Sequence, residues 1–159
     1  MPGGLKTLLP TDPLQIKMQK LAEEAVIVAH RHGVLMDFSA QSLEKVDPQL
    51  DAISASYRAA KVIEADMGAR CLIWGAYVGE VIRKHHGGGE WSDGPDGTGH
   101  GTYPLTVRHE TLYPCRWCVE RVQSGSSVSI WKEYQAFAFA DLMRRGDPVA
   151  RPMSPTNSK

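Results

Sequence analysis

The chain has 159 residues, of which 42% are hydrophobic and 23% are charged. This composition is that of a globular protein with a buried core, and it excludes a disordered or fibrous chain. The 18 basic and 18 acidic residues cancel, whereas nucleic-acid-binding proteins usually carry a basic excess, so no nucleic acid is expected as a partner.

The sequence also bears on the cellular compartment. No apolar run reaches the roughly 20 residues that a membrane span requires, and residues 1–6 lack the charged and apolar blocks of a secretory signal. We therefore expect a cytoplasmic protein with no membrane partner. In that compartment Cys71, Cys115 and Cys118 are expected to be reduced thiols.

The first predicted element is an amphipathic helix from about residue 13 to about residue 32. Thr11 or Asp12 can cap its N-terminus, and Pro13 can occupy its first position, where the missing proline amide would be unpaired in any case. Gly33 is a natural stop, because glycine readily adopts the left-handed conformation that follows a helix.

A second helical stretch follows a short extended link, with Ser39 as its N-cap. Its apolar stripe runs to Ile53, but Pro48 lies inside the stripe and disfavours helical geometry at Asp47. We therefore predict either a kink or two short helices, the second of them capped by Asp47.

A long helix, predicted from about Tyr57 to Lys84, organises the rest of the chain. Its apolar residues are too widely distributed for a helix with one buried side, so we expect it to be contacted on several sides. Gly75 and Gly79 each weaken the helix interior by about 1 kcal/mol relative to alanine. This cost is explained if another backbone approaches the helix closely at both positions.

Three glycines, residues 87–89, follow this helix. A glycine loop can cradle a phosphate, but phosphate loops follow a strand and open a helix. Because these glycines come after a helix, we interpret them as a C-cap and hinge.

Beyond the glycines the apolar spacing changes to that of a small antiparallel meander. Its three strands are expected at residues 90–92, 102–111 and 113–123, with a mobile, turn-rich loop at 93–100. A final helix over 128–143 is expected to begin at Ser126 or Ser127 and to end at Gly146.

The sequence therefore predicts a single α+β domain over residues 1–146, followed by a disordered tail at 147–159. In this domain, N-terminal helices and a long central helix pack on the small antiparallel three-stranded meander, and a C-terminal helix follows.

The spacing of Cys115 and Cys118 is that of half a zinc site or of a redox pair, with His85 and His86 as candidate metal partners. On the predicted strand the two cysteines point to opposite faces, and a redox cysteine would need a helix N-terminus. The histidines are expected to be solvated cations at a helix end. We therefore predict no metal and no cofactor, and keep a metal-binding regulator or enzyme as an alternative.

Glu80 lies on an otherwise apolar helix. It is expected to form an ion pair with Arg83, Lys84 or Arg121 at the edge of the core, or else to act as a pocket carboxylate. A second alternative function is a small-ligand-binding domain, with Glu80 and Arg121 in a pocket between the long helix and the sheet. The full set of candidate binding residues is Glu80, Arg83, Trp91, Arg116, Trp117 and Arg121.

Several motifs occur in the order seen in a bacterial domain family of unknown function. They are Met36–Ser39 with Ser42, Leu43, Val46 and Asp47; Gly75–Arg83; Gly88, Gly89 and Trp91; and Tyr113, Pro114, Val119, Arg121, Gly125 and Ser129. The chain resembles this family over about residues 36–135, and departs from it at Pro48, Cys115 and Cys118. The resemblance implies a small α+β domain and supplies no established activity.

Some similar small bacterial proteins inhibit toxins, so the resemblance suggests a protein partner by analogy. The sequence contains no recognisable catalytic set, and its Trp- and Tyr-rich segments can serve as interface anchors. We therefore predict a non-enzymatic protein-binding module, such as an immunity protein or adaptor that inhibits or escorts a cognate bacterial toxin or effector. The oligomeric state stays open.

Overall fold

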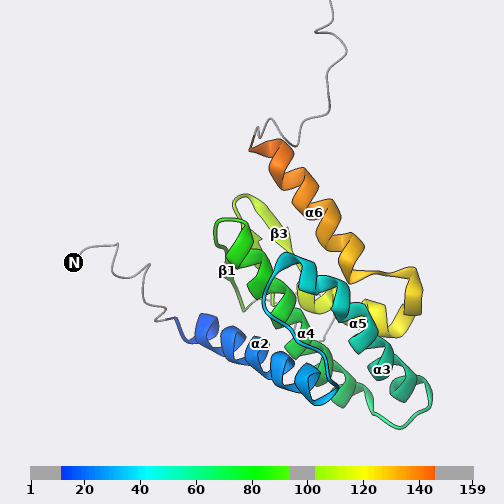
Figure 1. Cartoon of the computed structure of the whole chain (residues 1–159). Coiled ribbons are helices and arrows are strands. Elements are labelled where there is room, and N and C mark those ends of the chain that lie inside the picture. Colours follow the sequence, from blue (N-terminus) through cyan, green and yellow to red (C-terminus); the bar gives the residue numbers. More distant parts are fainter. Residues whose placement is uncertain (1–11, 94–102, 146–159) are drawn as a thin grey trace, which may run out of the picture.

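The computed structural model describes residues 12–93 and 103–145 (Figure 1). They form an α+β fold with a three-stranded antiparallel sheet. Its helices are α2 (Pro13–Arg31), η1 (Ala40–Lys45), α3 (Val46–Arg58), α4 (Glu64–His85), α5 (Pro114–Ser124), η2 (Gly125–Ser127) and α6 (Ile130–Arg144), and its strands are β1 (Glu90–Trp91), β2 (Leu105–Val107) and β3 (Glu110–Leu112). The predictions for the loop after Asp93, for Gly146 and for the tail lie outside the described residues.

Helix α4 is the centre of the structure, as predicted. Figure 1 shows α2 on one side of it and α3 and α5 on the other. The helix begins at Glu64 rather than near Tyr57, because Ala60 adopts a left-handed φ of 59° that ends α3 and separates the two helices. Trp74 and Tyr77 of α4 are buried almost completely.

Two glycines of α4 allow close contacts. A Cβ atom on Gly75 would lie 2.4 Å from the Cα atom of Cys115, so the α5 backbone approaches α4 there, as predicted. A Cβ atom on Gly79 would lie 2.1 Å from the ring of Trp91. The neighbour at Gly79 is therefore an indole ring and not the backbone that we expected.

The capping predictions for the first two helical stretches are confirmed in part. Asp12 accepts a hydrogen bond from the Leu14 amide at 2.9 Å, and Ser39 accepts one from the Ser42 amide at 3.1 Å. The second stretch forms two helices, η1 and α3, but Asp47 does not cap α3. Pro48 sits in the first turn of α3, where its missing amide removes no helical hydrogen bond.

The sheet is a meander with strand order β1-β2-β3. Trp91 pairs with Leu105, which pairs in turn with Leu112, and all three side chains are buried. The predicted strand at 102–111 is wrong in its extent, because the chain turns at Arg108 and forms both strands of a hairpin.

The strand predicted at 113–123 is wrong, because these residues form α5. Pro114 occupies the first turn, where proline favours helix initiation. The buried residues Cys115, Cys118, Val119 and Val122 recur at spacings of three, four and seven, which is the period of a helix. The spacing of two between Trp117 and Val119 was misleading.

The final helix starts later than predicted. Ser129 is its N-cap and accepts a hydrogen bond from the Lys132 amide at 3.2 Å, whereas Ser126 and Ser127 lie in η2. No helix within the described part of the chain has the length and apolar character needed to cross a bilayer.

The contact at Gly79 gives a first prediction. Gly79→Ala forces a methyl group into the Trp91 ring, and overpacking of this kind lowers the free energy of unfolding by about 1–3 kcal/mol. Gly68→Ala, at a half-buried position of the same helix, should instead raise it by up to about 1 kcal/mol. Urea denaturation followed by circular dichroism measures both, and equal stability of the two variants would contradict the close packing.

Candidate functional site

Glu80, Arg83 and Trp91, three of the predicted binding residues, meet at the C-terminal end of α4. Arg83 donates to both carboxylate oxygens of Glu80 at 2.9 and 3.0 Å, and Trp91 Nε1 donates to Glu80 Oε2 at 2.8 Å. Arg83 Nε also donates to the Gly89 carbonyl oxygen at 2.8 Å. The predicted ion pair with Arg83 is confirmed, and the carboxylate joins β1 to α4.

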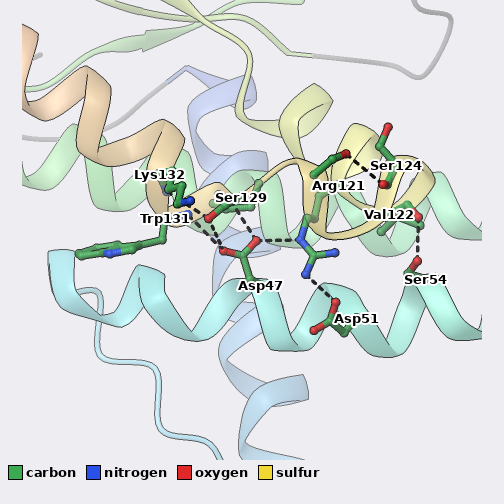
Figure 2. A network of polar contacts seen from close by, with 11 residues as sticks. Asp47, Asp51, Ser54, Arg121, Val122, Ser124, Ser129, Trp131 and Lys132 are labelled. Carbon is green, nitrogen blue, oxygen red and sulfur yellow. Dashed lines mark hydrogen bonds and ion pairs between the residues drawn. The ribbon is translucent and has the colours of Figure 1, made fainter.

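Arg121 belongs to a second network, drawn in Figure 2. Its Nε donates to Asp47 Oδ1 at 3.1 Å, and its Nη2 donates to Asp51. Asp47 also accepts from Ser129 Oγ at 3.0 Å and from the Ile130 amide at 3.0 Å. Asp47 therefore supports the N-terminus of α6 beside its N-cap Ser129 instead of capping its own helix, and it ties α3, α5 and α6 together.

The remaining two candidates, Arg116 and Trp117, lie near the start of α5. The Arg116 guanidinium lies over the Tyr113 ring at 4.6 Å, and its Nε is 3.8 Å from Glu120. Trp117 is half-buried against the core. The structure thus does not combine the six candidates into one site, and Glu80 and Arg121 bond different partners instead of sharing the expected pocket.

The sequence interpretation missed a third network, centred on His86. This side chain was expected in solvent but is only 5% exposed. Its Nδ1 lies 2.9 Å from Asp141 Oδ2 and its Nε2 lies 2.9 Å from the Tyr134 hydroxyl. Both ring nitrogens of His86 therefore have partners within the fold. His85, by contrast, is exposed and contacts the Phe38 carbonyl oxygen at 2.9 Å.

Asp141 holds this third network together. Its side chain is completely buried. Burial alone raises the pKa of Asp141, but the hydrogen bond from His86 and the positive charges of Arg108, His86 and Arg145 outweigh it, so the pKa is lowered. Burial and the nearby Asp141 charge raise the pKa of Tyr134. The ionised carboxylate is therefore a permanent part of the fold near neutral pH.

The three cysteines are free thiols, as predicted, and all of them are buried. Because residues 114–124 form a helix, Cys115 and Cys118 share its inner face, contrary to the strand prediction. Cys115 does lie in the first turn of that helix, where a redox cysteine would be placed. However, burial raises the pKa of Cys71 and of Cys115 to about 12, so the reactive thiolate form is strongly disfavoured.

The geometry does not support the predicted metal alternative. In residues 12–93 and 103–145, no three His, Cys, Asp or Glu side chains converge in a way that could hold a metal ion. His86 is occupied by Asp141 and Tyr134, and the cysteines lie in the core between α4 and α5.

An apolar groove lies at the C-terminal end of α2. It has a volume of about 360 Å³ and is lined by Val26, Ile27, His30, Arg31, Val34, Leu35 and Met36, which we call the α2 groove. Ile27 is 52% exposed and Leu35 is 67% exposed. This surface was not predicted from the sequence, since Ile27 was simply part of the predicted first helix and Leu35 part of the extended link after it.

Comparisons of the chain with protein-family models, with curated proteins and with solved structures find no match. The resemblance to a bacterial domain family thus stays a prediction. Function is inferred from the geometry of the described residues.

The Asp47 network gives a second prediction. Asp47→Ala leaves the buried Arg121 with one fewer carboxylate and removes the acceptor of the Ile130 amide, so the free energy of unfolding should fall by about 3 kcal/mol or more. The matched variant Asp51→Ala removes a side chain that is 61% exposed and should cost less than about 1 kcal/mol. Chemical denaturation measures the free energy of unfolding of both variants. Equal decreases would show that the Asp47 contacts stabilise the fold no more than the exposed Asp51 contact does.

The lowered pKa of Asp141 gives a third prediction. Its ionised form stabilises the fold above the unfolded-state pKa of 3.8, and this contribution is lost as the pH falls through the lower folded-state pKa. Asp141→Asn should therefore destabilise the protein at pH 7 and make its stability depend less on pH below about pH 4. Glu110→Gln is the control, because Glu110 is a half-buried partner of Arg144 that lies outside the His86 network. The free energy of unfolding is measured against pH by chemical denaturation. If it falls as steeply below about pH 4 in Asp141→Asn as in the parent protein, the stabilising role of the ionised Asp141 is contradicted.

Proposed function

We propose that this chain is a non-enzymatic protein-binding module that receives an apolar segment of a partner protein in the α2 groove. The observation that carries this proposal is that Ile27 and Leu35, which both line that groove, are both exposed. Large apolar side chains that line a surface groove are typical of interaction sites, whereas single exposed ones are common.

The lining of the groove indicates the chemistry of the partner. Both titratable side chains that line it, His30 and Arg31, are basic. A partner segment that presents apolar side chains flanked by carboxylates would therefore match it in shape and in charge. Complete burial of an Ile or Leu side chain is worth about 1.5–3 kcal/mol, so the exposed parts of Ile27 and Leu35 together can supply about 2–4 kcal/mol of binding free energy.

The polar networks support the same proposal indirectly. Glu80 and Arg121 were the strongest candidates for a pocket, and each is instead bonded within the fold. The sequence resemblance gives the proposal its more specific form, an immunity protein or adaptor that inhibits or escorts a cognate bacterial toxin or effector in the cytoplasm.

The test is a binding measurement with the proteins encoded beside this gene. We expect the full chain to form a stoichiometric complex with one of them, measured by isothermal titration calorimetry. Replacing both Ile27 and Leu35 by Glu should weaken the complex about 100-fold or more, because both apolar anchors are lost and carboxylates then face the carboxylates of the partner.

Ile63→Glu is the matched control, since Ile63 is 68% exposed and lies outside the groove at the start of α4. It should leave the affinity unchanged. The proposal is wrong if no neighbouring gene product binds, or if the double variant binds as tightly as the parent chain.

A further inference from the structure

A second cavity lies beside the three glycines that follow α4. It has a volume of about 300 Å³ and is lined by Gly87, Gly88, Gly89, Glu90, Thr106 and Arg108. The predicted C-cap is confirmed, because the Gly88 amide donates to the Arg83 carbonyl oxygen at 2.9 Å. This capping role does not account for the basic side chain that faces the glycines.

Arg108 has an unusual backbone conformation. It occupies the turn between β2 and β3 with a left-handed φ of 55°, a region that L-residues with a side chain rarely adopt. Holding a non-glycine residue there costs about 1 kcal/mol or more. Strain of this kind is retained where the surrounding structure requires the side chain in one place.

The Arg108 side chain is held from one edge. Its Nε lies 3.1 Å from Asp141 Oδ1, and Asp141 is itself buried and bonded to His86. The other edge lies against Gly87, since Nη1 and Nη2 would lie 3.0 and 3.3 Å from a Cβ atom on this glycine. The forked guanidinium group of Arg108 is thus oriented before any ligand binds, which lowers the entropic cost of binding.

The charged side chains around the cavity balance, because Arg108, Arg144 and Arg145 are matched by Asp141, Glu110 and Glu90. The carboxylate of Asp141 lies within 4 Å of Arg108, Arg144 and Arg145, and Glu110 pairs with Arg144. Glu90 is the acidic residue in the lining, and it is exposed on the edge strand β1.

We propose that this cavity binds an oxyanion, a phosphate or carboxylate group, which accepts hydrogen bonds from the free Nη edge of Arg108. The guanidinium edge supplies two donors in the plane that such groups require, and Thr106 adds a hydroxyl to the lining. Gly88 leaves room for the ligand to approach the backbone, because a Cβ atom there would meet nothing within 4 Å, whereas Gly87 and Gly89 are flanked closely by Arg108 and by β2. This site is separate from the α2 groove and does not depend on the proposed function.

The experiment titrates the full chain with sodium phosphate, sodium acetate or sodium chloride at constant ionic strength. Amide signals of residues 87–89 are followed by heteronuclear NMR. We expect saturable shifts with a Kd of about 1 mM or below for phosphate or acetate, and none for chloride. Tighter binding of phosphate would identify a phosphate group as the ligand, and tighter binding of acetate would identify a carboxylate.

Two substitutions are expected to change the affinity for the oxyanion in opposite directions. Arg108→Gln removes the donors and should weaken binding at least tenfold, whereas Glu90→Gln removes the opposing carboxylate and should tighten it severalfold. Arg144→Gln is the control, because it removes the same charge from a side chain outside the lining and should leave the Kd within twofold.

Thermal denaturation first establishes that each variant is folded. If Arg108→Gln does not fold, then Arg108→Lys, which keeps the charge but lacks the fork, takes its place with the same expected loss. The proposal is overturned if phosphate and acetate shift these amides no more than chloride, or if the Arg108 variant binds as tightly as the parent chain.

Discussion

The structure depends on how closely α4 is approached at its two buried glycines. The α5 backbone lies against Gly75, and the Trp91 ring fills the space beside Gly79. A side chain at either position would push away the element that carries the neighbouring contact. With the Trp91 ring in this place, its indole nitrogen reaches Glu80, so the packing contact also fixes the polar network at the end of α4.

Three carboxylates connect the elements that this packing brings together. Glu80, Asp47 and Asp141 each accept hydrogen bonds from more than one element of the fold. A buried ion pair adds little net stability compared with apolar packing, but losing one partner leaves the other charge uncompensated. These residues therefore specify one arrangement of the helices, which explains why charged residues that looked functional in the sequence are used inside the fold.

Local signals in the sequence predicted much of this fold. The caps at Asp12 and Ser39 and the central helix follow from short-range chemistry. The cost of a glycine inside a helix indicated the close approach of another backbone at Gly75. The strand predicted at 113–123 failed because short apolar segments fit helix and strand periods alike, and tertiary packing decides between them. His86 was misplaced for a related reason, since its partner Asp141 lies 55 residues away in sequence.

The two proposed binding surfaces draw on different parts of the fold. The α2 groove is built from the C-terminal end of α2, whereas the N-terminal part of that helix meets β1 through a hydrogen bond from Gln15 to the Trp91 carbonyl oxygen at 3.2 Å. The oxyanion cavity is built from β1, β2 and the glycines between α4 and β1. No residue lines both, so substitutions in one should act independently of the other.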